Sequence, residues 1–199
     1  MWGDRAKIVL AAAFGVITIA LVFTAAFIVA SAMVLALYET VGVPYFFQGP
    51  SFVRATGTIF VGIGLSFIAW TFLYRRPTEV IVSTWITIRK LLRRVQVDQR
   101  LGRTEPFLPL GPYRFVRNPI YFGAVSALFG GGICFLSTTF IVWSILMFLW
   151  FSFVLIPFEE RELSVLFGAA YEEYKKQVPK MFPTGRRFKG PRESLGLSR

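Results

Sequence analysis

Three long runs of uncharged, mostly apolar residues constrain the fold of this chain more than any other feature. They cover residues 8–38, 55–74 and 118–158. A helix needs about 20 residues to cross the roughly 30 Å hydrocarbon core of a bilayer. The first two runs therefore predict one span each, and the third is long enough for two. The small polar stretch from Leu136 to Thr139 predicts the turn between those two spans.

The first run is longer than one crossing requires and too short for two, so its helix must tilt, kink or protrude. A cleaved signal peptide is the alternative interpretation. The run exceeds the usual apolar region of about 7–15 residues and has no obvious small-x-small site before Glu39. We expect a membrane span.

The positive charges predict which ends of the spans face the cytoplasm. The chain has 22 Lys and Arg residues and a net charge of +11. They gather before the first span, between residues 75 and 117, and from Arg161 onward, whereas only Arg54 lies between the first two spans. The positive-inside rule then places both termini and residues 75–117 in the cytoplasm. This orientation and contact with lipid headgroups explain the basic charge without a nucleic acid partner.

The single cysteine, Cys134, and the absence of histidine narrow the possible chemistry. They exclude an intrachain disulfide, a zinc site of the usual Cys/His kind and any His-based catalytic triad. We expect no metal. Chemistry must depend on carboxylates, arginines, tyrosines, amides and backbone groups.

The connection after the second run contains two kinds of segment. Apolar residues recur every three or four positions over residues 79–95, with basic residues in the second half, which predicts an amphipathic helix in the cytoplasmic interface. A simple membrane anchor is the favoured interpretation of it, and a lid over a lipid-accessible site is the alternative. Residues 98–112 are rich in Gly and Pro and predict an irregular loop.

The segment "GPYRFVRNPIYFG", residues 111–123, lies at the mouth of the third predicted span. Asn118 is expected to cap that helix, with Pro119 in its first turn. Arg114 and Arg117 would flank the span, and Tyr113 and Tyr121 would form part of its aromatic belt. These positions explain why the segment contains arginines and tyrosines, but not why it contains so many of them.

Glycines lie within the second and third predicted spans. Small side chains allow helices to approach closely in lipid, so these faces predict a hairpin packed against the rest of the bundle. The glycines are Gly57, Gly62, Gly64, Gly123, Gly130, Gly131 and Gly132.

Acidic residues follow the fourth predicted span, where a basic flank is usual. A carboxylate such as Glu159 at this depth is a candidate functional residue, with an arginine of residues 111–123 as its partner. A surface salt bridge at the headgroups is the alternative. Gly168 is expected to end this helix, and a second helix with Glu172 against Lys176 would follow, up to Val178.

The order "GPYRFVRNPIYFG", a two-span hairpin and "EERELSVLFGAAYEEYKKQVPKMFP" resembles the isoprenylcysteine carboxyl methyltransferase family, which is related to the membrane phospholipid methyltransferases. The resemblance covers roughly residues 105–183. It implies S-adenosylmethionine as cofactor in a cytoplasmic pocket and a lipid-like acceptor reached from the bilayer. The positions that match cofactor-binding positions of the family are Glu105, Pro106, Phe107, Leu108, Tyr113, Asn118, Pro119, Ile120, Tyr121 and Glu159.

The resemblance also implies roles for some of these residues. Glu159 would bind the cofactor's ammonium group, and Asn118 or nearby backbone N–H groups its carboxylate or adenine. Asn118 stands where the family has His. Leu155 stands where the eukaryotic prenylcysteine enzymes carry an arginine associated with substrate, so a different lipid-like acceptor is expected. The sequence identifies no catalytic and no substrate-binding residue.

We therefore predict an all-α polytopic membrane helical bundle with about four transmembrane helices, an interfacial amphipathic helix and short C-terminal cytoplasmic helices. A single domain would comprise N-terminal spans (1–104), a cofactor-binding region (105–183) and a basic flexible tail (184–199). The predicted function is methyl transfer from S-adenosylmethionine to a lipid-like or isoprenoid carboxylate or amine. An NADPH-dependent membrane sterol-type reductase and a non-enzymatic four-span transporter are the alternatives.

Overall fold

A computed structural model describes residues 2–82 and 109–188 of the chain, and the secondary-structure elements named in these ranges are all helices. An isolated bridge between Phe46 and Ser137 is the one β-type pairing in this part of the chain. The all-α prediction is confirmed. The helices are α1 (Trp2–Val41), α2 (Ser51–Phe72), α4 (Pro119–Cys134), α5 (Thr138–Trp150), α6 (Ile156–Phe167) and α7 (Ala169–Gln177). A 3-10 turn, η1 (Gly111–Arg114), precedes α4, and a π-helical turn, η2 (Phe151–Leu155), joins α5 to α6.

The predicted spans correspond to long apolar helices. The stretches Ala13–Val41, Ser51–Phe72 and Thr138–Phe167 are long and apolar enough to cross a membrane. The remaining helix of the hairpin, α4, is a shorter apolar helix of 16 residues. At 1.5 Å per residue it measures about 24 Å, a little less than the hydrocarbon core. The turn within the hairpin lies where it was predicted, between Cys134 and Thr138.

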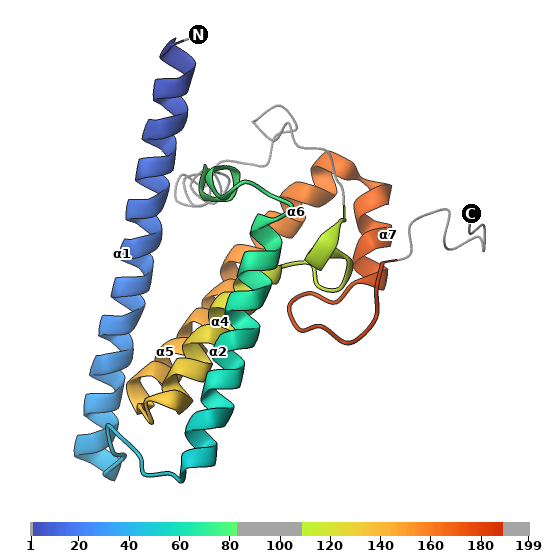
Figure 1. The fold of residues 1–199 in the computed structure, drawn as a ribbon. Helices are drawn as coiled ribbons and strands as arrows, with labels where there is room; N and C mark the ends of the chain where they lie inside the picture. The colour runs from blue at the N-terminus through green and yellow to red at the C-terminus, as the bar shows by residue number, and fades with distance from the viewer. Residues whose placement is uncertain (1, 83–108, 189–199) are drawn as a thin grey trace.

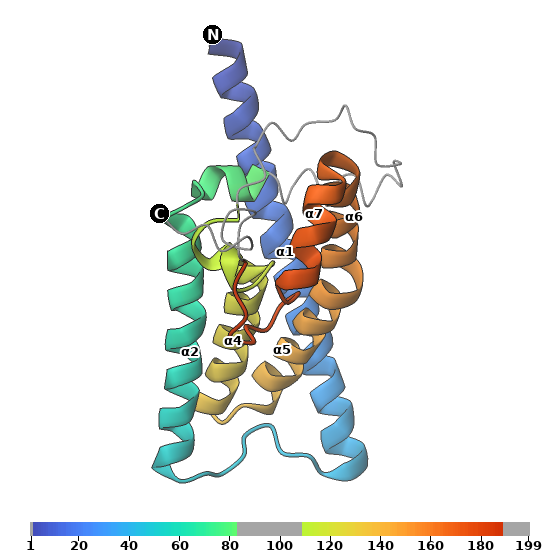
Figure 2. The same cartoon turned by 90° about the vertical axis from the view of Figure 1, so that its right-hand side faces the viewer.

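The helices pack in the spatial order α1, α5, α4, α2, and the views in Figures 1 and 2 show this arrangement. The start of α1, the end of α2, η1, α6 and α7 lie at one end of the bundle. At the other end, the Thr138 hydroxyl donates to the Pro44 carbonyl over 2.6 Å, and the Phe47 N–H donates to the Leu136 carbonyl over 2.9 Å. The loop after α1 is thus attached to the hairpin turn.

Glycines bring α2 and α4 into backbone contact. A Cβ atom added to Gly57 would lie 2.7 Å from the Gly130 carbonyl oxygen, and one added to Gly130 would lie 2.6 Å from the Gly57 carbonyl oxygen. Gly64 and Gly123 meet in the same reciprocal way. The predicted close approach of the hairpin is confirmed. Three of the predicted glycines do not take part in this contact. No atom lies within 4 Å of the place that a Cβ of Gly62 would take, and Gly131 and Gly132 face α5.

The apolar core lies between α4, α5 and η2 and includes a residue from beyond α7. Its buried members are Phe122, Met147, Phe151, Leu155, Ile156 and Met181. We call residues 178–188 the C-terminal strap. The strap leaves α7 and returns along the hairpin, where Phe182 contacts the rings of Phe122 and Phe148. Figure 2 shows this return beside α4.

Several predicted features fall wholly or partly outside the described residues. The predicted amphipathic helix begins at Pro77 and is helical through residue 82, and the rest of 79–95 lies outside the described ranges. The same holds for residues 98–108 of the predicted irregular loop and for the tail from residue 189. At the end of that loop the prediction was wrong, because Gly111 and Pro112 belong to a 3-10 turn.

We predict that Gly64→Ala destabilises the protein by about 1–3 kcal/mol, because its methyl group would overlap the backbone of Gly123 and Ala127. Gly62→Ala is the matched control on the same helix. Its methyl group meets open space, so the free energy of unfolding should stay the same or rise by about 0.5–1 kcal/mol. Unfolding in mixed micelles measures both, and equal effects would contradict the packing described above.

Candidate functional site

The 3-10 turn η1, before α4, places the polar motif, residues 111–123, against α6 and α7. Gly111 has φ 55°, a conformation that favours glycine, and an added Cβ would collide with the Tyr74 ring at the end of α2. Pro112 is buried in the first turn of η1. The turn therefore packs against the end of α2 and holds the segment that carries Tyr113, Arg117 and Asn118 beside it.

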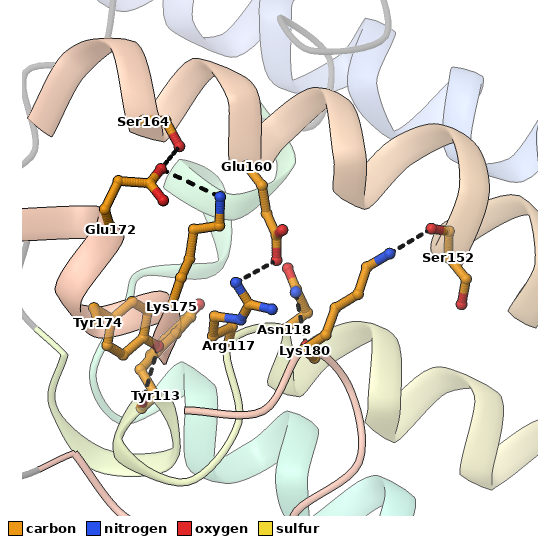
Figure 3. A network of polar contacts seen from close by, with 10 residues as sticks. All are labelled: Tyr113, Arg117, Asn118, Ser152, Glu160, Ser164, Glu172, Tyr174, Lys175 and Lys180. Atoms are coloured by element: carbon orange, nitrogen blue, oxygen red, sulfur yellow. Dashed lines mark hydrogen bonds and ion pairs between the residues drawn. The ribbon is translucent and has the colours of Figure 1, made fainter. Parts of the chain in front are cut away.

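Asn118 has a different role from the one predicted. It occupies the N-cap position of α4, with Pro119 as the first helical residue, but its side chain makes no capping hydrogen bond. Its Nδ2 instead donates to the Lys180 carbonyl oxygen over 2.8 Å (Figure 3). Next to it, the Arg117 N–H donates to the Pro179 carbonyl oxygen over 3.0 Å. Asn118 therefore attaches the C-terminal strap to the motif.

Arg117 forms an ion pair with Glu160 of α6. Its Nη1 atom lies 3.1 Å from Glu160 Oε1, and the two side chains are only 11% and 14% exposed. An arginine of the motif is thus linked to an acidic residue after the hairpin, but that residue is Glu160, whereas Glu159 was the predicted partner. Neighbouring residues on a helix point about 100° apart, so two adjacent glutamates can reach two different partners.

Glu159 contacts Tyr121, another predicted site residue. The Tyr121 hydroxyl donates to Glu159 Oε1 over 2.9 Å. The Tyr121 ring stacks on Phe151 with a centroid separation of 4.6 Å and an interplanar angle of 27°. Two residues far apart in the sequence are thus brought together, and an aromatic face lies beside a carboxylate.

The helix that carries these glutamates is interrupted by the π-turn. The Ile156 N–H bonds to the Phe151 carbonyl, five residues earlier. The next residue, Pro157, has no N–H with which to continue the pattern to Ser152. The Lys180 ammonium group fills this position, because its Nζ atom donates to the Ser152 carbonyl oxygen over 2.6 Å (Figure 3).

Helix α7 supports the motif from the other side. The buried Tyr174 hydroxyl donates to the Tyr113 carbonyl oxygen over 2.7 Å. Gly168, with φ 52°, ends α6 as predicted and turns the chain into α7. The predicted pair of Glu172 with Lys176 is wrong. Glu172 pairs with Lys175 at 3.2 Å, and Lys176 pairs with Glu173 at 3.6 Å.

The pKa values in this region have clear causes. Burial raises the pKa of the Tyr174 hydroxyl above its ordinary value, so this group stays protonated and able to donate. Hydrogen bonds from Ser164 and Lys175 lower the pKa of the exposed Glu172 carboxyl. Within residues 2–82 and 109–188 no group of three or more acidic, Cys or His side chains could hold a metal ion.

The predicted site residues within the described ranges gather around η1, the start of α4 and the first turn of α6. Pro119 is buried, and Ile120 is partly buried in the first turn of α4. Glu105, Pro106, Phe107 and Leu108 lie outside the described residues. The sequence reasoning missed Lys180, Ser152, Glu160 and Tyr174. Pro157 within an apolar run was the available signal for the first two, since a proline there leaves a carbonyl without its helical donor.

Comparison with known proteins points to one family. Residues 99–170 match the model of a family described as phospholipid methyltransferase. The resemblance to membrane methyltransferases is confirmed. Methanethiol S-methyltransferase 1 of Bradyrhizobium diazoefficiens is 36% identical over 77 residues, which cover 36% of this chain and 24% of the relative. The chain therefore spans about a quarter of that relative's length, and no solved structure matches it significantly. We call residues 99–170 the matched segment.

We predict that Glu160→Gln lowers the free energy of unfolding by about 3–5 kcal/mol, because it leaves the buried Arg117 without a counter-charge. Replacing both residues, as Arg117→Met with Glu160→Met, should recover much of that loss. Unfolding in mixed micelles compares the two variants. A double variant less stable than Glu160→Gln would contradict the pairing.

We predict that Tyr174→Phe costs about 1 kcal/mol at neutral pH through loss of the hydrogen bond to Tyr113. The difference between parent and variant should shrink above pH of about 10, where the tyrosine ionises in the unfolded state but not in the folded one. The parent thus loses stability as pH rises, while the variant lacks this contribution. Unfolding measured from pH 7 to 11 tests this, and a constant difference would count against it.

Proposed function

We propose that this integral membrane protein transfers a methyl group from S-adenosylmethionine to a lipid-like acceptor. The observation that carries the proposal is the contact between Tyr121 and Glu159, which joins the start of α4 to α6 at 2.9 Å. It brings together two positions that the family resemblance assigns to the cofactor. Both lie in the matched segment.

The residues around this contact suit a cofactor with a positive amino group, an adenine ring and several polar groups. The Glu159 carboxylate would bind the ammonium group, with its orientation set by the Tyr121 hydroxyl. The stacked rings of Tyr121 and Phe151 offer an aromatic surface. Arg117 Nε is buried and has no hydrogen-bond partner in the described part of the chain, so its N–H can still donate to a ligand.

The site's task in such a reaction is mainly alignment. When bound, S-adenosylmethionine supplies an electrophilic methyl group on a sulfonium that carries its own leaving group. The chain then has to hold donor and acceptor in line and keep water away, which side chains without histidine can do. Glu159, Tyr121 and the remaining cofactor-position residues are therefore proposed as binding residues.

The position of the site favours an acceptor that arrives from the bilayer. Its residues lie where membrane helices end, beside apolar side chains such as Phe182, which is 52% exposed. Leu155 is only 3% exposed and belongs to the core, so this position offers no charge to a substrate carboxylate. We propose a lipid-like or isoprenoid carboxylate or amine. A thiol is the second candidate, because the relative is named as a methanethiol S-methyltransferase.

We further propose that the site faces the cytoplasm. The start of α1, the end of α2 and the helices α6 and α7 share one end of the bundle (Figure 1). Of the 22 Lys and Arg residues, Arg54 alone lies between α1 and the end of α2 and near the other end. The positive-inside rule makes the end with α6 and α7 the cytoplasmic end.

Titration calorimetry of the detergent-purified protein with S-adenosylmethionine, S-adenosylhomocysteine and NADPH tests the cofactor. We expect both adenosyl compounds to bind and NADPH not to. NADPH binding alone would favour the reductase alternative, and no binding of any of the three would oppose the methyltransferase proposal. A panel of lipid carboxylates, amines and thiols with labelled cofactor then identifies the acceptor class.

We predict that Glu159→Gln and Tyr121→Ala each weaken S-adenosylhomocysteine binding by about 100-fold, because the ammonium group loses its charged, oriented partner. Glu172→Gln, at an exposed carboxylate on α7, is the matched control and should bind like the parent. Thermal unfolding without ligand shows whether each variant folds. Parent-like binding by both site variants would refute the assignment.

A further inference from the structure

Lys180 contacts two residues of the matched segment, Asn118 and Ser152, although it lies outside that segment. Three contacts fix its place in the C-terminal strap. The Asn118 side chain donates to its carbonyl, the preceding carbonyl of Pro179 accepts from Arg117 N–H, and the following residue, Met181, is buried in the core. The backbone of Lys180 is therefore held against the motif on both sides.

The charge of Lys180 is not matched by an acidic side chain in the described part of the chain. Its hydrogen bond from Nζ goes to a neutral group, the Ser152 carbonyl, and the contact is partly buried. By contrast, Arg117 pairs with Glu160, and Lys175 pairs with Glu172. A charge held away from water is normally paired, and an ammonium group has three donors. The structure thus presents a cation with capacity for an anionic ligand.

The position of this cation relative to Glu159 indicates which anion fits. Ser152 lies next to Phe151 in η2, and Glu159 lies further along the chain in the first turn of α6. Carbonyls point toward the C-terminal end of a helix, so the Ser152 carbonyl directs the ammonium group toward Glu159. Tyr121 bridges the interval, since its ring stacks on Phe151 and its hydroxyl reaches Glu159. Tyr121 thus contacts both the Glu159 carboxylate and Phe151, the neighbour of the residue whose carbonyl holds the Lys180 ammonium group.

We propose that Lys180 binds the carboxylate of the cofactor's amino-acid part while Glu159 binds its ammonium group. This inference rests on the proposed function and deepens it. An amino acid is a zwitterion, and charge-assisted hydrogen bonds to both of its ends fix its position and direction. Asn118, which the sequence had offered for the carboxylate, instead positions Lys180 through its backbone.

Two ligands that differ only by the carboxylate test the proposal: S-adenosylhomocysteine and its decarboxylated analogue. We expect the parent to prefer S-adenosylhomocysteine by about 10- to 100-fold. Lys180→Met should abolish this preference while binding the decarboxylated analogue like the parent, and Lys180→Arg should restore part of it. Glu159→Gln should weaken binding of both ligands. Lys176→Met, which changes an exposed lysine on α7, is the matched control.

Several outcomes would overturn the inference. The first is a preference retained by Lys180→Met. The second is an equal loss of both ligands in that variant, which would make Lys180 only a structural clip for the π-turn. A parent that binds both ligands equally would also refute the role of Lys180, yet leave the methyltransferase proposal standing. A parent that binds neither would refute the methyltransferase proposal and this inference with it.

Discussion

The missing backbone N–H of Pro157 determines how the C-terminal strap is attached at the end of the bundle that holds the candidate site. Backbone polar groups within a membrane must find partners inside the protein, because the hydrocarbon core offers none. After the π-turn, Pro157 cannot donate to the Ser152 carbonyl, and the Lys180 ammonium group takes its place at 2.6 Å. The C-terminal strap is thereby attached to the hairpin at the point where Tyr121, Phe151 and Glu159 meet. π-turns of this kind are frequent at functional sites.

The charged residues of the site have two kinds of partner. Arg117 and Glu160 pair with each other, are largely buried and serve to join η1 and α4 to α6. Glu159 and Lys180 instead contact neutral groups: Glu159 accepts from the Tyr121 hydroxyl, and Lys180 donates to the Ser152 carbonyl. Under the proposed function, these two opposite charges would bind the two charged ends of the cofactor's amino-acid part.

The membrane architecture could be predicted because apolar run length responds to a single physical requirement, the thickness of the bilayer. The hairpin turn at residues 135–137 and the glycine contacts between α2 and α4 followed from the same kind of local signal. The ion pairs of the site did not follow from a local signal. Glu160 pairs with Arg117, and Glu172 with Lys175, because pairing depends on the angle at which helices meet and on which rotamers fit. The sequence spacing left several of these choices open.

Under the proposed function, Leu155 limits which methyl acceptor the protein can bind. This residue is packed against the core between the hairpin helices, where a charged side chain would lack both water and an anionic neighbour on its own element. Under the proposed function, a substrate carboxylate would not be held there, and polar recognition of the acceptor would come from the end of the bundle where α6 and α7 lie. The apolar part of the acceptor has a surface available on the same helix, where Phe153 is 73% exposed. An acceptor with a polar head at the level of Glu159 and an apolar tail along η2 satisfies both conditions.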